Sequence, residues 1–303
     1  MSLPLIIDLD GTLVRTDTLV ESALSVAMRR PVRFLALLLL LLKGRAAFKR
    51  GMADAAKLDC ATLPYNRDII EFIRKRREGG GQVWLVTAAD GRIAHGVADH
   101  LKLFDGVIAS DGAHNLKGPN KAVTLAERFT QGFDYVGDAP ADLPVWEKAS
   151  HVYVAGGSSS ALRALKQRGL VPMRRFDPLP MRARDWVKAL RRHQWSKNLM
   201  LFVPLMLGQA FHDPAMVARL IMGFLCFGLV ASATYLFNDM NDLEADRAHM
   251  GKRHRALASG RLSLVKGAGL GTAMLLAGIV GAVILSPGFA LVVLCYLALT
   301  LAY

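Results

Sequence analysis

A short apolar run near the start of the chain ends in two carboxylates. Leu5–Ile7 has the composition of a buried strand, and Asp8 and Asp10 follow it before Gly11 turns the chain. Side chains two positions apart on a strand share a face, so both carboxylates can reach one site. A simple turn would also account for Asp-Gly after an apolar run. Paired carboxylates favour a nucleophile beside a group that binds a metal or moves a proton.

Two later apolar runs also end in polar residues. Residues 82–86 lead into the hydroxyl of Thr87, and residues 134–136 lead into Gly137-Asp138-x-x-x-Asp142. Lys121 begins a helical pattern between them. From residue 91 to residue 169 strands alternate with helices, which predicts an α/β fold with a doubly wound, Rossmann-like parallel sheet. Ligands of such sheets bind at the carboxyl ends of the strands, where these polar residues fall.

Together these motifs resemble those of the haloacid dehalogenase (HAD) superfamily of phosphohydrolases. The resemblance implies that Asp8 is a nucleophile, that Asp10 is the general acid/base, and that Thr87 and Lys121 hold phosphoryl oxygens. Lys117 is a rival for the lysine role, but Lys121 is preferred because it opens a helix. The resemblance also implies a Mg²⁺ site with carboxylate ligands. The candidate ligands are Asp8, Asp10, Asp138 and Asp142.

This resemblance predicts a phosphatase domain at about residues 1–175, with an inserted helical cap at about residues 15–80. Within the cap, residues 32–42 form an apolar segment with basic residues on both sides. The segment is too short to cross a bilayer, which takes about 20 residues. It can be a buried cap helix or a helix lying in the membrane interface. Either arrangement puts an apolar surface over the phosphatase site.

The last third of the chain contains long apolar segments. Residues 215–237 and 262–285 are long enough to span a membrane, and residues 288–303 begin a third span. Prolines interrupt the pattern near residues 171–180, which predicts a domain boundary there. The loop at 238–261 is rich in Lys and Arg, whereas residues 212–214 have none. The positive-inside rule therefore predicts a multi-pass protein of the cell (inner) membrane, with the N-terminal domain and this loop in the cytoplasm.

The formal net charge of +13 also bears on partners. Few aromatic residues accompany the basic ones before residue 180, so nucleic acid is not an expected partner. Apolar segments bordered by Lys and Arg favour a lipid bilayer with an anionic surface.

A second acidic motif follows the first predicted span. Asp239, Asp242 and Asp246 lie three and four positions apart, so they would share a face if the helix continued. Three carboxylates on one face repel each other unless a cation bridges them. Mg²⁺ bound to a diphosphate is a natural solution.

This motif resembles the first aspartate-rich motif of the UbiA-type intramembrane prenyltransferases, and residues 191–198 resemble a subgroup, the polyprenyl-phosphate phosphoribosyltransferases. The resemblance implies transfer of phosphoribose from phosphoribosyl pyrophosphate to a polyprenyl phosphate by an all-α transmembrane bundle at about residues 182–303. Ala256 departs from the pattern, which usually has proline there. The implied substrate-binding residues are Lys197, Asn198, Asn238, Lys252 and Arg253. The chain stops inside an apolar run and before a second aspartate-rich motif, so we expect the front part of a longer protein and an inactive transferase half.

Three functions remain open from the sequence. The first is a bifunctional enzyme whose phosphatase acts on the product of the transferase. The second is prenyl transfer from an isoprenoid diphosphate to an aromatic acceptor, with the phosphatase cleaving a soluble phosphate ester. The third is a non-enzymatic, membrane-anchored regulator that binds phosphate, although the complete set of catalytic residue types argues against it.

Overall fold

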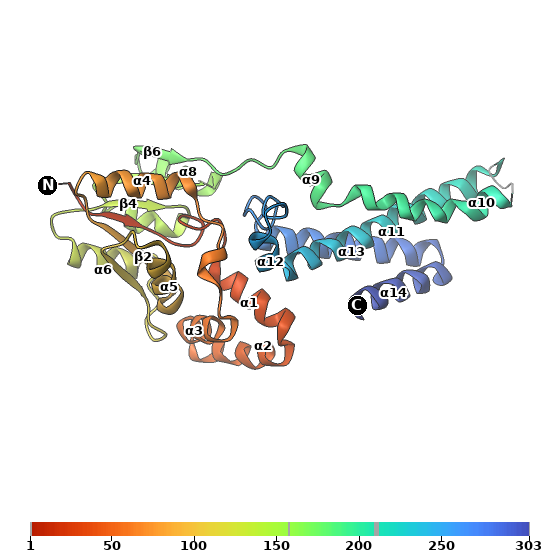
Figure 1. The fold of residues 1–303 in the computed structure, drawn as a ribbon, viewed down its shortest axis with the longest axis horizontal. Helices are drawn as coiled ribbons and strands as arrows, with labels where there is room; N and C mark the ends of the chain where they lie inside the picture. Colours follow the sequence, from red (N-terminus) through yellow and green to blue (C-terminus); the bar gives the residue numbers. More distant parts are fainter. Residues whose placement is uncertain (1, 157, 209–211, 303) are drawn as a thin grey trace. The chain divides into compact units, whose positions relative to one another are not determined.

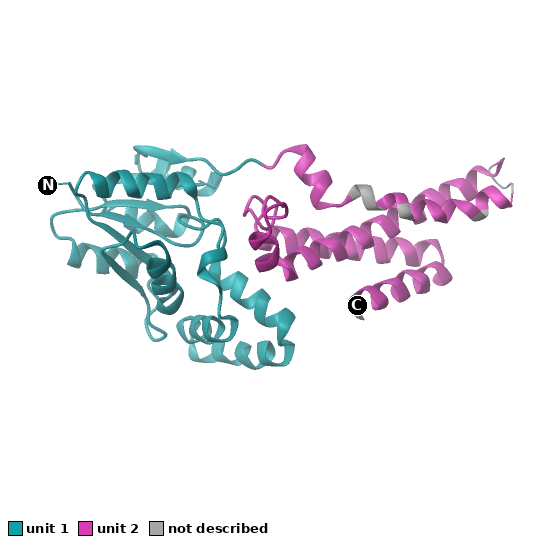
Figure 2. Ribbon diagram, viewed as in Figure 1, with its two compact units in different colours: residues 1–180 teal, residues 181–303 magenta. Residues whose placement is uncertain are grey.

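The computed structural model describes two compact units, residues 1–180 and residues 181–303 (Figures 1 and 2). We call them the N-terminal unit and the C-terminal unit. The described residues are 2–156, 158–208 and 212–302, and the side chains at 192–194, 197, 204, 301 and 302 lie outside the described part.

A six-stranded parallel sheet organises the N-terminal unit, in the order β3-β2-β1-β4-β5-β6. β1 is central, and Ile7 pairs with Leu85 on one side and with Val136 on the other. The doubly wound α/β fold predicted from the sequence is therefore confirmed. The strands are β1 (Leu5–Ile7), β2 (Val83–Asp90), β3 (Gly106–Ser110), β4 (Asp134–Gly137), β5 (His151–Ala155) and β6 (Arg174–Phe176).

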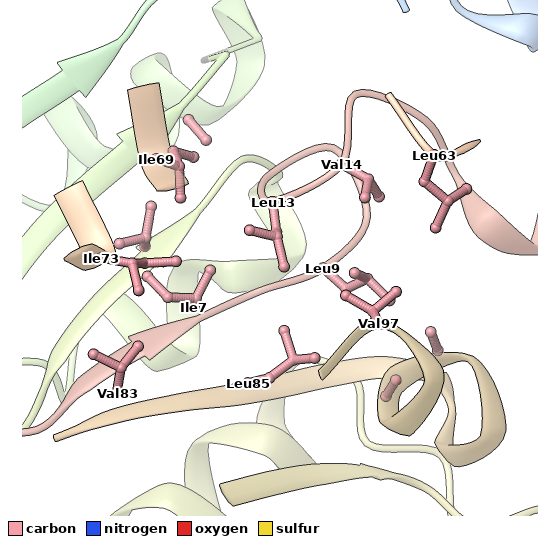
Figure 3. Packing of buried hydrophobic residues seen from close by; sticks show 14 of the residues in the cluster. Ile7, Leu9, Leu13, Val14, Leu63, Ile69, Ile73, Val83, Leu85 and Val97 are labelled. Atoms are coloured by element: carbon pink, nitrogen blue, oxygen red, sulfur yellow. The ribbon is translucent and has the colours of Figure 1, made fainter. Parts of the chain in front are cut away.

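Helices cover both faces of this sheet. Alternate residues of β1 point to opposite faces, and all three are completely buried, as expected for a central parallel strand. On one face Ile7 packs with Ile73 of α4 and Val97 of α5 (Figure 3). On the other face Ile6 packs with Leu125 of α6 and with residues of α7 and α8. The helices are α4 (Arg67–Glu78), α5 (Gly91–Leu101), α6 (Pro119–Arg128), α7 (Leu143–Trp146) and α8 (Ser159–Gln167), with short 3₁₀ segments at η2 (Cys60–Thr62) and η3 (Pro140–Asp142). Because this unit contains a complete sheet with a hydrophobic core on each face, it meets the requirements of a domain that folds alone.

The cap is a small helical layer between β1 and α4. It consists of α1 (Thr18–Arg29), α2 (Pro31–Leu38), the 3₁₀ helix η1 (Leu39–Lys43) and α3 (Arg45–Ala56), packed around Val26 and Met52. The cap was expected to end at about residue 80, but it ends before α4 begins at Arg67. The apolar face of α4 packs on the sheet, so α4 belongs to the core. Of the two alternatives for residues 32–42, the buried cap helix is excluded, because no residue of α2 or η1 is buried.

The C-terminal unit is helical. Its two long helices, α11 (Pro214–Asn241) and α13 (Leu264–Leu285), have the length and mean hydropathy, 2.0 and 2.2, of membrane spans. They pack closely because α13 presents glycines to α11. A Cβ at Gly278 would lie 2.8 Å from the carbonyl oxygen of Cys226, so only glycine allows this approach. The remaining elements are α9 (Ala183–Ala189), η4 (Arg192–Phe202), α10 (Val203–Leu207), α12 (Leu243–Ala248) and α14 (Pro287–Ala302).

Candidate functional site

Three carboxylates meet at the carboxyl edge of the sheet. Asp8 follows β1, and its backbone N–H donates to the carbonyl oxygen of Val136 in β4, which sets the two strand ends side by side. One oxygen from each of Asp8, Asp138 and Asp142 lies within 4.8 Å of the others. Such a cluster of oxygen ligands suits a hard divalent cation. The structure thus brings together three of the four metal ligands predicted for the N-terminal unit.

Lys121 supplies a buried positive charge to this cluster. From α6 its ammonium group donates to Asp8 Oδ1 at 2.9 Å, and it lies 3.4 Å from Asp142 Oδ1. Burial alone would lower the pKa of Lys121, but the carboxylates of Asp8 and Asp142 outweigh it, and the pKa is raised. The rival Lys117 is exposed. The preference for Lys121 therefore agrees with the geometry.

Tyr135 is a member of the site that sequence reasoning missed. Its hydroxyl accepts from Lys121 Nζ at 2.9 Å and donates to Asp142 Oδ1 at 2.7 Å. It fixes the lysine and the aspartate relative to each other from β4. The available signal was a residue with a polar tip within a predicted strand, three positions before Asp138.

Two glycines make room for the carboxylates. Gly11 has φ +71°, and a Cβ there would lie 2.2 Å from Asp138 Oδ2. A Cβ at Gly137 would lie 2.7 Å from Asp142 Oδ2. The backbone N–H groups of Asp138 and Ala139 both donate to Asp142 Oδ2 at 3.2 Å, which orients that side chain. The glycines in the two motifs are thus required by close approach.

Asp10 lies beside the cluster and is held by the cap. Its Oδ1 accepts from the backbone N–H of Thr18 at the start of α1, at 2.8 Å. Among the described residues the metal-type cluster contains Asp8, Asp138 and Asp142, so the structure does not bring the Asp10 carboxylate into it.

Thr87 and Lys49 complete the edge of the site. Thr87 is buried near the carboxyl end of β2, and its hydroxyl accepts from the backbone N–H of Ala89 at 3.0 Å. Lys49 comes from α3 of the cap and donates to the carbonyl of Ala88 at 2.6 Å and to Asn115 Oδ1 at 2.8 Å. Burial lowers the pKa of Lys49, while Asp10 opposes this effect. The sequence showed Lys49 only as part of a basic flank.

The carboxyl groups carry more negative charge than the lysine offsets. Burial raises the pKa of Asp8 to about 6, with Lys121 acting in the opposite direction. Burial, and then the charge of Asp17, raises the pKa of Asp10 to about 7. Burial, and then the charges of Asp8 and Asp142, raises the pKa of Asp138 to about 8. A divalent cation would supply the missing positive charge, so these residues fit Mg²⁺.

The C-terminal unit holds a second polar centre at the end of α11. Arg255 Nη1 lies 3.0 Å from Asp239 Oδ1 and 2.6 Å from Asp246 Oδ2, so one guanidinium joins both buried carboxylates. Arg191 also pairs with Asp239. Lys252 Nζ lies 3.9 Å from Asp246. Arginine therefore occupies the space between two predicted metal ligands.

The helix does not continue unbroken through the aspartate-rich motif, although this was the condition for the three carboxylates to share a face. α11 ends at Asn241, and Asp242, with ψ 14°, links it to the short α12. Because helical periodicity breaks there, Asp242 is exposed while Asp239 and Asp246 are buried. The three carboxylates do not share one face.

The predicted substrate-binding residues around this motif have different environments. Asn238 and Arg253 are exposed. Asn198 is buried, and its Nδ2 has no hydrogen-bond partner among the described residues. The side chain of Lys197 lies outside the described residues.

A pocket of about 290 Å³ adjoins Asp239 and Arg255. Basic side chains outnumber acidic ones on its walls, which favours an anionic ligand. Arg191, Arg255 and Arg261 line this pocket but were not among the residues that the sequence singled out, although Arg255 belongs to the basic motif that follows the aspartates. The ionisable lining residues are Asp185, Lys188, Arg191, Asp239, His254, Arg255 and Arg261.

Comparison with known families agrees with this division into two sites. Residues 5–147 match the haloacid dehalogenase-like hydrolases, and residues 199–303 match the UbiA prenyltransferase family. The chain joins a HAD region to a UbiA region. Both resemblances drawn from the sequence are confirmed, and both families are enzymes. The UbiA region contains two helices that are long and apolar enough to cross a membrane, in agreement with its family match.

Relatives and solved structures resemble different parts of the chain. An uncharacterised protein of Sinorhizobium fredii is 44% identical over 302 residues, covering 99% of this chain and 58% of its own length. A decaprenyl-phosphate phosphoribosyltransferase of Mycobacterium tuberculosis is 40% identical over 121 residues, covering 39% of this chain and 40% of its own. The chain thus spans roughly half the length of these relatives. A phosphoserine phosphatase structure in the apo form has 16% identity and a TM-score of 0.42, covering 58% of this chain and 94% of that one.

Proposed function

We propose that the HAD region is a Mg²⁺-dependent phosphomonoesterase. The observation that carries this proposal is the contact of Lys121 with Asp8 inside the cluster of Asp8, Asp138 and Asp142. A carboxylate beside a buried ammonium group is placed to attack phosphorus while the positive charge stabilises the phosphoryl oxygens. Bound Mg²⁺, held by the three carboxylates, would supply further positive charge to the same oxygens.

The reaction follows from the placement of two carboxyl groups. An Asp8 oxygen forms a bond to phosphorus as the bond from phosphorus to the ester oxygen breaks, and Asp10 gives its proton to the departing alcohol. Asp10 then takes a proton from water as the water oxygen attacks phosphorus, which releases phosphate and restores Asp8. A pKa of about 7 suits Asp10 for giving and taking a proton near neutral pH.

Residues 1–180 with an Asp8→Asn substitution test the nucleophile. Asparagine keeps the shape of the side chain but cannot attack phosphorus as a carboxylate does, so kcat for a phosphomonoester with Mg²⁺ should fall by at least about 10³-fold. Asp99→Asn, at an exposed carboxylate on α5, is the matched control and should retain full activity. Undiminished turnover by Asp8→Asn would refute the assignment.

For the UbiA region we propose transfer of phosphoribose from phosphoribosyl pyrophosphate to a polyprenyl phosphate. Its support is the basic pocket beside Asp239 and the similarity to the decaprenyl-phosphate enzyme, which covers 39% of this chain. Lys252 and Arg255 would offset phosphate charge, and Asp239 and Asp246 would hold Mg²⁺, which would supply further positive charge to the diphosphate. Prenyl transfer to an aromatic acceptor is the competing reaction. Membranes containing the full-length protein should transfer label from phosphoribosyl pyrophosphate to polyprenyl phosphate, and prenylation of an aromatic acid instead would select the competitor.

We further propose that the HAD region removes phosphate from the product of the UbiA region. A lipid-linked 5-phosphoribose still carries a phosphomonoester, which is the class of group that Asp8 would attack. Fusion would raise the local concentration of this product to roughly millimolar. In the full-length protein, Asp8→Asn should make the phosphorylated lipid accumulate, whereas the wild type should release phosphate. Equal amounts of phosphorylated lipid from both would refute the coupling even with both regions active.

A further inference from the structure

The cap carries an apolar face that no described residue of the N-terminal unit covers. α2 and η1 pack inward through Phe34 and Leu37, which contact the cluster around Met52. Leu40 also points inward, because a Cβ on Gly51 of α3 would lie 2.4 Å from its Cδ1. These contacts fix which side of the segment faces the cap core and which side faces outward.

The outward side consists of large aliphatic residues. Val32 and Leu42 are 80% and 87% exposed, and Leu35 and Leu39 are 64% and 66% exposed. We call these four residues the cap face. Single exposed leucines are common on protein surfaces. Several exposed aliphatic residues on one short segment instead indicate a surface that binds a partner or a membrane.

Positive charge surrounds the cap face. Between Glu21 and Asp54 the chain contains no acidic residue. Of the seven Lys and Arg residues in that interval, Lys49 and Arg50 turn towards the sheet, where they donate to the carbonyls of Ala88 and Asp111. The other five are exposed: Arg29, Arg30, Arg33, Lys43 and Arg45.

We propose that the cap face docks on the surface of an anionic lipid bilayer. At the surface of a bilayer, acyl chains can receive the leucines, and phosphate groups a few ångströms away can pair with the flanking cations. The apolar cap face and its basic flanks therefore match the acyl layer and the headgroup layer. A second copy of the chain would bring the same five cations against each other, which disfavours self-association through this face. The inference concerns the N-terminal unit alone and does not depend on the proposed reactions.

Docking of this kind has a consequence for access to the site. α3 follows η1 directly, and its Lys49 reaches the strand edge beside Thr87. The same small layer therefore links the cap face to the phosphatase site. A phosphomonoester carried on a lipid would meet the cap without leaving the bilayer surface.

Vesicle binding by residues 1–180 tests the proposal. Sedimentation with vesicles that contain phosphatidylglycerol should capture the protein, and vesicles of phosphatidylcholine alone should capture far less. Each basic residue near an anionic surface contributes about fivefold in affinity, so Arg29, Arg30 and Arg33 changed together to Gln should lower it by roughly 100-fold. Leu35→Asp with Leu39→Asp should also abolish binding. The matched control is Val171→Asp, which changes an apolar residue that is 82% exposed on the same unit.

A second experiment uses the full chain in nanodiscs, where the predicted spans are inserted in the bilayer, and measures fluorescence quenching by the lipids. A fluorophore on Leu42→Cys should be quenched by lipids spin-labelled in the acyl chain, whereas one on Val171→Cys should not, with Cys60, Cys226 and Cys295 replaced by serine. Circular dichroism of the variants checks that they fold. Equal quenching at the two positions, or equal capture by both kinds of vesicle, would overturn the proposal. A Leu42→Cys disulfide between copies without quenching would assign the face to self-association instead.

Discussion

Lys121 Nζ lies 2.9 Å from Asp8 Oδ1, although 113 positions separate the two residues in the chain. The pair joins a helix on one face of the sheet to the end of its central strand. Both side chains are buried, so the contact is less screened by solvent than a surface ion pair. The catalytic proposal and the stability of the site both depend on it.

Replacing Lys121 should destabilise the N-terminal unit and remove its activity. In Lys121→Met, Asp8 and Asp142 lose their buried positive partner, and leaving buried charges unpaired costs about 3 kcal/mol. Urea denaturation of residues 1–180 measures this loss. Lys117→Met, at the exposed lysine four positions earlier, should stay within about 0.5 kcal/mol of the wild type. Equal losses from the two changes would contradict the role given to Lys121.

The stability of the N-terminal unit without metal should fall as pH rises. The pKa values of Asp8, Asp10 and Asp138 are raised from 3.8 to about 6, 7 and 8, chiefly by burial. The folded state therefore keeps protons that the unfolded state has released, and this contribution is lost between about pH 4 and pH 8. Thermal unfolding in EDTA should show the decline.

Mg²⁺ should reverse this decline, because it replaces the protons as the source of positive charge. The increase in Tm on adding Mg²⁺ should be larger at about pH 8 than at about pH 5, where protons compete for the carboxylates. Asp138→Asn removes the carboxyl group with the highest pKa and should flatten the pH dependence in EDTA. A Mg²⁺ effect that is the same at both pH values would argue against a metal at this cluster.

Comparison of Gly11 with Gly80 separates the cost of backbone strain from the effect of a clash with Asp138. Both have a positive φ, +71° and +73°, but a Cβ on Gly11 would meet Asp138 whereas one on Gly80 would meet nothing within 4 Å. Alanine at either site should cost about 1 kcal/mol of backbone strain. Gly11→Ala alone should also displace Asp138 and weaken Mg²⁺ binding by at least about tenfold, as measured by calorimetry. Matching affinities in the two variants would show that Asp138 is not constrained by this contact.

Arg255 should matter more than its exposed neighbour Arg253 for binding of a diphosphate. Arg255 contacts Asp239 and Asp246 and lines the pocket, so Arg255→Ala removes a positive charge that would offset the charge of the diphosphate. We expect affinity for phosphoribosyl pyrophosphate with Mg²⁺ to fall by at least about tenfold in detergent. Arg253→Ala is the control and should change it little. The reverse order of effects would move the donor site away from Asp239.

The loop after α11 should lie on the same side of the membrane as the N-terminal unit. Single cysteines at Met250 and at Val171, both well exposed, should resist an impermeant maleimide in intact cells and react after lysis. A cysteine at His212, before α11, should react in intact cells. Labelling of Met250→Cys from outside would refute the topology.

The sequence by itself determined the local elements and the chemistry of the strand ends. An apolar run followed by Asp8, Asp10 and Gly11 strongly favours a buried strand that ends in a tight turn. Strand patterning and turn residues determine local structure over only a few positions, so they can be recognised without knowledge of the tertiary fold. The same holds for the long apolar helices α11 and α13, whose length and hydropathy suffice for a membrane span. The α/β fold follows from such local signals, whereas the roles expected of Asp8, Asp138 and Lys121 are those that the resemblance to the HAD motifs implies.

Only the tertiary structure decided which side chains meet. The sequence could not show that Tyr135 joins Lys121 to Asp142, or that Arg255 lies between Asp239 and Asp246. It also could not show that α4 packs on the sheet and is not part of the cap. It also left open whether the leucines after Arg30 were buried, because a helix with one inward face has the same composition in a core or on a surface. Contacts between distant segments depend on packing and register, and a break at one residue such as Asp242 is enough to separate carboxylates that regular helical spacing would bring together.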